Sequence, residues 1–154
     1  MPHIHQLNDF VVSAYIVHEA RVLLVHHKGL NLWLPIGGHI ELDEDPEQAL
    51  WREIEEETGL LREELELLSN VRLPLQDNGF RSLPAPQYLD THVINAGHQH
   101  IGLTYFLRAK SDAVRLNADE HYELRWFSKD EIETFPLKEN VRAYTKEALR
   151  RMST

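Results

Sequence analysis

The chain has 154 residues, 42% of them hydrophobic, which suffices for one ordinary domain with a sizeable core. It has no cysteine, and this excludes a disulfide scaffold, a thiolate metal site and a cysteine nucleophile. The net charge of −9 argues against binding to a polyanion such as DNA, which needs a basic patch.

The N-terminal third predicts a pair of strands. Residues 10–17 (FVVSAYIV) and 21–27 (RVLLVHH) are apolar runs joined by three residues, and a turn is expected at 28–31. The start of the chain has no basic region followed by an apolar run, and no apolar stretch reaches the ~18 residues of a membrane span. We therefore expect a cytoplasmic protein without a signal peptide. His3 and His5 are expected in a terminal strand or tail.

A short apolar piece and the pair Gly37-Gly38 precede a strongly marked helix over about residues 46–58. Asp45 is a good N-cap, Pro46 suits the first helical position and Gln48 completes a capping box. Gly59 suits the C-terminal end of the helix.

Acidic residues crowd this helix and the segment before it. Nine acids and one arginine lie between Gly38 and Leu60, so most of the net charge is concentrated there. At about 100° per residue, Glu53, Glu56 and Glu57 share one arc beside the core-facing arc, and Ala49 should leave open space in front of them. Carboxylates at this spacing repel one another, and the helix dipole disfavours anions in its second half. The spacing alone leaves two interpretations: a solvated acidic face, or a site for a hard cation such as Mg²⁺ or Mn²⁺.

Beyond the helix the sequence predicts further strands and two more helices. Strands are predicted at 64–75 and 122–128, a loop at 76–86, and a hairpin around Gly97 formed by 87–96 and 100–110. Ser128 and Glu131 predict the capped start of a short helix, and residues 138–152 form an amphipathic helix. This order of elements predicts an α/β domain in which helices pack on the faces of a mixed β-sheet.

The acidic segment also has a specific spacing. Gly38, five residues, Glu44, seven residues and then the run REIEEETGL (52–60) fill every fixed position of the pattern Gly-x5-Glu-x7-Arg-Glu-U-x-Glu-Glu-x-Gly-U, in which U is a bulky aliphatic residue. This resembles the Nudix box, and on that resemblance residues 1–154 are identified as a single Nudix (MutT-like) hydrolase domain. The resemblance implies a Nudix-type α/β/α sandwich with a mixed β-sheet.

The resemblance also implies an activity. It implies hydrolysis, at the pyrophosphate, of a nucleoside diphosphate linked to another moiety, with Mg²⁺ or Mn²⁺ as cofactor; the substrate would be a nucleoside triphosphate, ADP-ribose, a dinucleotide or a nucleotide sugar. Glu53, Glu56 and Glu57 would be the catalytic, metal-binding acids, the backbone carbonyl of Gly37 or Gly38 would be a further ligand, and Glu53 would be a candidate base. Glu44 and Arg52 would form a structural ion pair. The implied partner is a small nucleotide, with no nucleic acid and no membrane, and a homodimer is a further expectation.

Two candidates lie outside the box. Glu120 precedes the last strand and would supply an extra ligand or a catalytic base, the alternative being an ordinary surface acid. His98 and His100 alternate along a strand and therefore point to one face, which His92 and Asp90 of the neighbouring strand share. These residues would line the substrate pocket, hold a structural metal ion, or only form hydrogen bonds along the strands.

Aromatic residues offer one more contact with substrate. Phe80 and Tyr88 would stack on a nucleotide base, the alternative being packing in the core or in a lid. Two other functions are alternatives to hydrolysis. A non-catalytic, nucleotide-sensing Nudix module would be expected to have a broken box, and the isoprenoid diphosphate isomerase branch resembles chemistry that needs a catalytic cysteine.

Overall fold

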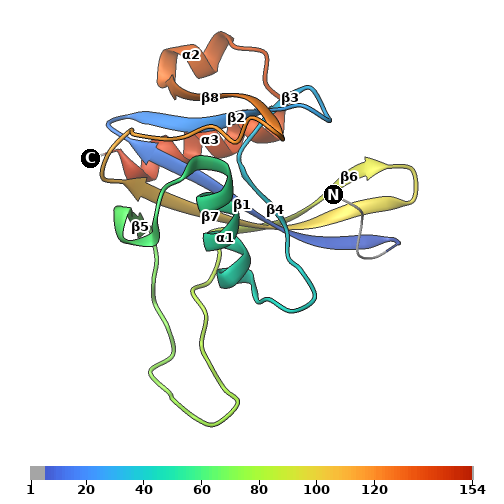
Figure 1. The fold of residues 1–154 in the computed structure, drawn as a ribbon, viewed down its shortest axis with the longest axis vertical. Helices are drawn as coiled ribbons and strands as arrows, with labels where there is room; N and C mark the ends of the chain where they lie inside the picture. Colours follow the sequence, from blue (N-terminus) through green and yellow to red (C-terminus); the bar gives the residue numbers. More distant parts are fainter. Residues whose placement is uncertain (1–5, 154) are drawn as a thin grey trace.

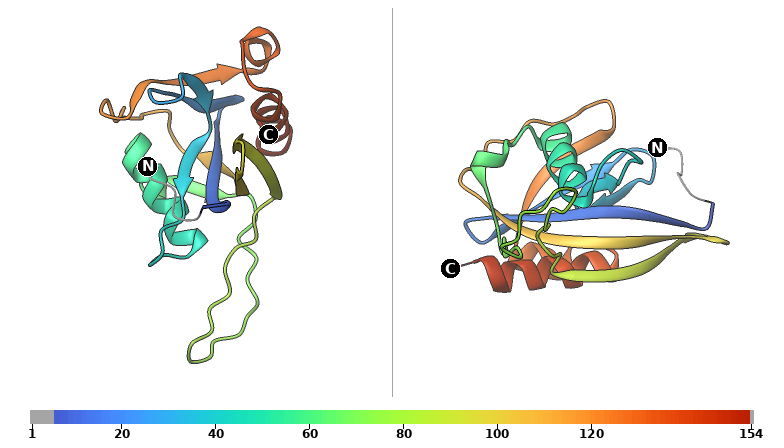
Figure 2. Two further views of the ribbon diagram at one scale, coloured as in Figure 1. Left: turned by 90° about the vertical axis from the view of Figure 1, so that its right-hand side faces the viewer. Right: turned by 90° about the horizontal axis from the view of Figure 1, so that it is seen from below.

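The computed structural model describes residues 6–153, and His3 and His5 lie outside the described residues. An eight-stranded mixed sheet lies between helices on its two faces (Figures 1 and 2), which confirms the predicted α/β/α sandwich. The strands are β1 Asn8–His18, β2 Arg21–His27, β3 Leu32–Leu34, β4 Ile36–His39, β5 Leu65–Leu67, β6 Tyr88–Asn95, β7 His98–Ala109 and β8 His121–Ser128. The helices are α1 Pro46–Thr58, the 3-10 turn η1 Arg62–Glu64, α2 Lys129–Thr134 and α3 Glu139–Met152. None of the helices within the described part of the chain is both long and apolar enough to cross a membrane.

Strand β1 is central to the sheet. It pairs in parallel with β7 along one edge, and its other edge is shared by β4 and β2, which are both antiparallel to it. β4 lies opposite residues 11–14 of β1, and β2 lies opposite residues 16–18. The outer edge of β7 is divided in the same way between β6 and β5.

Alternate side chains of β1 point into two separate cores. Val12, Ala14 and Ile16 pack with α1 on one face of the sheet. Tyr15 and Val17 pack with α3 on the other face. α1 and α3 therefore lie on opposite faces of the sheet, as Figure 2 shows.

Helix α1 has the predicted bounds and the predicted caps. The Asp45 side chain accepts the Gln48 backbone N–H at 2.9 Å, the Gln48 side chain accepts the Asp45 backbone N–H at 2.9 Å, and Gly59 has a left-handed φ of 74°. The predicted open space at Ala49 is wrong, because this residue is fully buried in the core. Its small side chain lets α1 approach the sheet closely.

The predicted strand at 64–75 is also wrong. Only Leu65–Leu67 is a strand, and residues 68–87 form a long loop that protrudes from the body of the protein (Figures 1 and 2). β6 occupies the edge of β7 at residues 98–104, so β5 cannot continue along that edge far beyond Leu67. The loop at 76–86, the hairpin around Gly97 and the capping box of Ser128 with Glu131 are confirmed.

A buried acid ties the long loop to the start of α1. Glu47 is only 3% exposed, and Arg72 of the loop donates to both of its carboxylate oxygens, at 2.7 and 2.8 Å. Arg62 donates to it at 3.0 Å, and Arg81 pairs with it at 3.5 Å and also bonds to the N-cap Asp45. Two arginines of one loop thus converge on the first turn of α1, a contact that the sequence does not predict.

Replacing Glu47 with glutamine should lower the free energy of unfolding at pH 7 by about 1–2 kcal/mol, because it removes a two-pronged, charge-assisted contact with a partly exposed arginine. Hydrogen bonding to Arg72 holds the pKa of Glu47 below its ordinary value of 4.5. This contribution to stability is present above pH 4.5 and is lost as the pH falls through the lowered pKa. Urea unfolding at pH 7 and pH 3 measures it, with Glu63→Gln on the exposed surface as control. The same difference at both pH values would contradict the prediction.

Candidate active site

Helix α1 carries the three predicted metal-binding acids, but it buries them unequally. Glu53 is 6% exposed and Glu57 is 4% exposed, and both lie on the side of α1 that faces the sheet. The side chain of Glu56 is 55% exposed at the edge of this pair. The site is therefore a buried pair of carboxyl groups with a third acid at its mouth.

Strand β4 provides the surface against which the pair lies. A side chain at Gly38 would place its Cβ 2.3 Å from Oε1 of Glu53, so only glycine leaves room for that carboxylate. The backbone of Gly37 interacts with the carboxyl group of Glu57 and acts to lower its pKa. The two glycines predicted to belong to the site thus contact its two buried acids.

Ionisation of the two buried carboxyl groups is unfavourable when no cation is bound. Burial, together with the charge of Glu53 and a hydrogen bond to it, raises the pKa of Glu57 well above its ordinary value of 4.5. Burial also raises the pKa of Glu53, against the opposing effect of Arg52. Among the described residues, Oε2 of Glu57 has no hydrogen-bond partner. A bound cation would stabilise both charges, and a set of carboxylate and carbonyl oxygens fits Mg²⁺ or Mn²⁺.

Arg52 links these acids to the loop that precedes α1. It donates to both oxygens of Glu44, at 2.9 and 2.6 Å, and to the His39 carbonyl oxygen at 3.0 Å. It also donates to Glu53 at 2.9 Å and to Glu56 at 3.3 Å. The pair of Glu44 and Arg52 expected from the resemblance thus has two charge-assisted hydrogen bonds, and it fixes the loop against the helix.

The turn before β8 and the first residue of β8 each bring one more titratable group toward Glu57. The charge of Glu120, which is exposed, contributes to the raised pKa of Glu57. His121 is 2% exposed, with Nε2 4.0 Å from Oε2 of Glu57, and burial lowers its pKa below the ordinary 6.5. His121 was not among the predicted site residues. Its place beside Glu120 was the only signal in the sequence, because its position opposite His27 is seen only in the structure.

The residues predicted to contact substrate do not gather around these acids. Phe80 lies 44% exposed on the protruding loop. Tyr88 packs against Phe106 and Tyr144 on the α3 side of the sheet, and its hydroxyl donates to Glu147. His98 and His100 share that face, because they alternate with residues of β7 that point toward α1.

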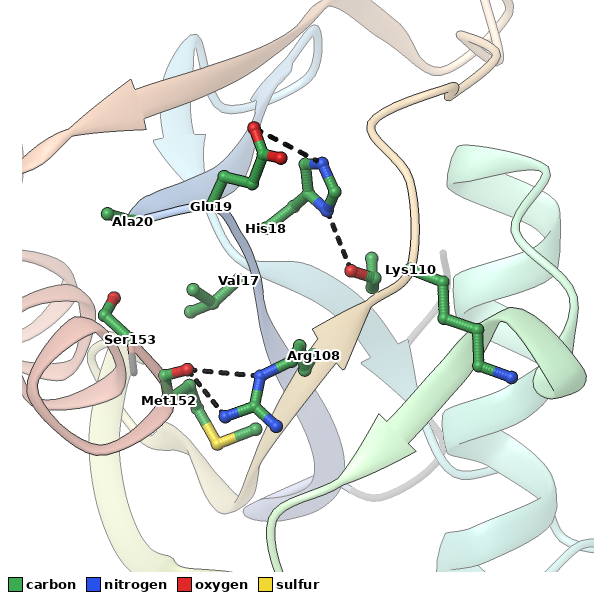
Figure 3. A pocket seen from close by; sticks show the side chains of 9 residues that line it. Val17, His18, Glu19, Ala20, Arg108, Lys110, Met152 and Ser153 are labelled. Carbon is green, nitrogen blue, oxygen red and sulfur yellow. Dashed lines mark hydrogen bonds and ion pairs between the residues drawn. The ribbon is translucent and has the colours of Figure 1, made fainter.

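A hollow of about 600 Å³ lies elsewhere, at the end of β1 and β7 (Figure 3). His18 and Arg108 line it, with Nδ1 of His18 2.8 Å from the Ala109 carbonyl oxygen and Arg108 donating to the Met152 carbonyl oxygen. The acids of α1 do not line it. We therefore place the candidate active site on α1 and β4 and not in this hollow.

Comparison with known proteins finds one matching family model and several relatives. A family model described as NUDIX domain matches residues 8–151. An RNA pyrophosphohydrolase of Methylococcus capsulatus is 37% identical over 113 residues, which cover 70% of this chain and 56% of that protein. An m7GpppN-mRNA hydrolase of Xenopus laevis is 37% identical over 79 residues, which cover 46% of this chain and 26% of that protein. The chain thus spans at most slightly more than half the length of these two relatives.

A solved structure resembles the chain over almost its full length. The crystal structure of a NUDIX family hydrolase from Clostridium perfringens has a TM-score of 0.80 and 31% sequence identity. The similarity covers 96% of this chain and 98% of that one.

Proposed function

The chain belongs to the NUDIX family, and from this premise we propose that it is a hydrolase that uses a divalent cation to cleave a pyrophosphate linkage. The substrate class is a nucleoside diphosphate joined to another moiety. The observation that carries the proposal is the buried pair of Glu53 and Glu57 against the glycines of β4. Two adjacent carboxyl groups in this environment are costly to ionise without a cation.

The chain's own groups have distinct roles in this proposal. Glu53, Glu56, Glu57 and the backbone carbonyl of Gly38 would hold Mg²⁺ or Mn²⁺. When bound, the cation supplies charge neutralisation at the pyrophosphate and lowers the pKa of water. Glu53 or Glu120 accepts the proton of the attacking water, and Arg52 keeps Glu53 oriented through its hydrogen bond at 2.9 Å.

Two substrate classes follow from different observations. The net charge of −9 favours a small nucleotide that is bound through cations. The similarity to an RNA pyrophosphohydrolase favours a second candidate, a pyrophosphate linkage in an RNA. We place the small nucleotide first, because a polyanion gains little from an acidic surface.

A hydrolysis screen that separates the nucleotide products by chromatography should detect turnover of at least one substrate with Mg²⁺ or Mn²⁺, and EDTA should abolish it. The screen includes nucleoside triphosphates, ADP-ribose, NADH, dinucleoside polyphosphates, nucleotide sugars and a 5′-triphosphorylated RNA oligonucleotide. Turnover of the RNA alone would reverse the order of the two substrate classes. Activity that persists in EDTA would contradict the role of the cation.

A non-catalytic module that senses a nucleotide is the alternative function. It predicts binding of a nucleotide in calorimetry with no turnover of any substrate in the screen. The complete set of acids on α1 favours the enzyme. A cytoplasmic location and a homodimer stay predictions, which cell fractionation and light scattering would test.

A further inference from the structure

A second cluster of metal-ligating side chains lies on the face of the sheet away from α1. It consists of Asp9 on β1 and of His98 and His100 on β7, and His39 on β4 lies beside Asp9. In the parallel pairing of β1 with β7, Asp9 lies opposite His100. Three neighbouring strands therefore bring one carboxylate and three imidazoles to the same place.

The cluster is separate from the acids of α1. His39 follows Gly38, and successive side chains on a strand point to opposite faces. Gly38 lies against Glu53 on the α1 side, so His39 points to the other side. There, the hairpin of β6 and β7 extends beyond the end of α3 (Figure 2).

The distances within the cluster suit a small ion held by several ligands. One ligand atom each from Asp9, His98 and His100 lies within 4.8 Å of the other two. Nε2 of His39 and Nε2 of His98 lie 3.3 and 3.5 Å from Oδ2 of Asp9. Tetrahedral Zn²⁺ with bonds of ~2.0–2.1 Å would separate its ligand atoms by ~3.3 Å. Direct imidazolium–carboxylate hydrogen bonds are shorter, at ~2.7–2.9 Å.

Burial and orientation support the same interpretation. Asp9 is 0% exposed, and a cation bound next to it would stabilise this buried carboxylate. Nδ1 of His98 lies 3.1 Å from the Gln6 carbonyl oxygen, which can only accept, so Nδ1 is the protonated nitrogen and donates. The other nitrogen of His98 then faces Asp9. Metal-binding histidines are commonly oriented in this way, by a backbone carbonyl behind the ring.

A hydrogen-bonded layer surrounds the cluster. The ring of His100 contacts the rings of His39, His92 and His98, with centroids 5.0 to 5.4 Å apart. Nδ1 of His92 lies 2.8 Å from Oδ1 of Asp90, whose other oxygen accepts the hydroxyl of Tyr144 on α3. The cluster is thereby connected to the helix that covers this face.

We propose that Asp9, His98 and His100 bind a transition-metal ion of the Zn²⁺ type, with His39 as the fourth ligand. A set rich in imidazole selects such an ion over Mg²⁺, which prefers oxygen ligands. Four protein ligands leave no open position, so the ion is structural and fixes β4 and the β6–β7 hairpin to β1. The proposal is independent of the hydrolase activity.

Equilibrium dialysis of tag-free, chelator-stripped protein against Zn²⁺ tests it, with the bound metal measured by elemental mass spectrometry. Glu57→Gln, which alters the acid site, and His26→Gln, outside the cluster, should each bind one equivalent that excess Mg²⁺ does not displace. His98→Gln and His100→Gln should lose at least ~100-fold in affinity, since removal of a ligand exceeds the effect of removing a supporting residue. Zn²⁺ should also raise the melting temperature of Glu57→Gln but not that of His100→Gln.

Two controls keep the test decisive. Circular dichroism establishes that each variant is folded, and the visible spectrum of Co²⁺ bound to Glu57→Gln should show the intense bands of tetrahedral coordination by imidazole nitrogen. This spectrum does not depend on whether a histidine variant folds. Absence of stoichiometric Zn²⁺ in folded protein, or full retention of it by both histidine variants, would overturn the proposal. The histidines would then only form hydrogen bonds with Asp9 and with the strands.

Discussion

Glu57→Gln should lower kcat/KM by about 10²- to 10⁴-fold and at the same time stabilise the cation-free protein by about 0.5–2 kcal/mol. The loss of activity follows because glutamine has no charge with which to hold the cation. The gain in stability follows because Glu57 is a buried carboxyl group next to another, with one oxygen that has no hydrogen-bond partner among the described residues. Catalytic acids often impose such a cost on the fold.

The gain in stability should depend on pH with a definite sign. The folded-state pKa of Glu57 is raised above 4.5, so the cation-free wild type loses stability as the pH rises from 4.5 through the raised pKa. In EDTA, the variant should therefore melt at a higher temperature than the wild type at pH 8 and at about the same temperature at pH 4. Adding Mg²⁺ at pH 8 should stabilise only the wild type.

Glu55→Gln is the matched control for this experiment. Glu55 is an exposed acid on the same helix, and its substitution should change neither turnover nor the dependence of melting on pH. Full activity of Glu57→Gln, or equal melting temperatures at pH 8 in EDTA, would refute the assignment.

Gly37→Ala and Gly38→Ala should have different consequences although the two glycines are neighbours: the first should lower stability and the second should lower activity. A Cβ at Gly37 would lie 2.0 Å from the Val12 carbonyl oxygen, which is backbone and cannot move aside. We expect Gly37→Ala to destabilise the protein by at least ~3 kcal/mol. A Cβ at Gly38 meets the end of the Glu53 side chain, which can rotate away. Gly38→Ala should therefore remain folded but lose activity.

Urea unfolding and kinetics with the substrate found in the screen separate the two effects. Gly29→Ala is the control, because its Cβ would meet only the side chain of His27, at 3.2 Å. A stable Gly37→Ala, or a Gly38→Ala with wild-type kcat/KM, would contradict the close packing of β4 on the acids.

The sequence predicted those features that depend on local signals. The bounds and caps of α1 follow from Asp45, Pro46, Gln48 and Gly59, whose effects extend over a single turn. His98 and His100 alternate along a strand, and this local pattern is enough to predict that both point to one face. The acids of α1 needed only helical periodicity to be grouped together.

Features that depend on the order of strands could not be predicted. The alternating apolar residues Val71, Leu73 and Leu75 resemble a strand, but the edge of β7 that such a strand would need belongs to β6. The contact of Asp9 with His98 and His39 requires β1 to lie between β7 and β4. The burial of Glu47 depends on arginines that lie 15 to 34 residues further along the chain.

Strand β4 has only four residues, and two successive ones contribute to different chemistry. Gly38 makes room for Glu53, while His39 directs its ring to Asp9 and its carbonyl oxygen to Arg52. A single inserted or deleted residue would exchange the two faces of the strand and disrupt both sets of contacts at once. Relatives of this chain that keep both sites should therefore differ by substitution but not by length between Ile36 and His39.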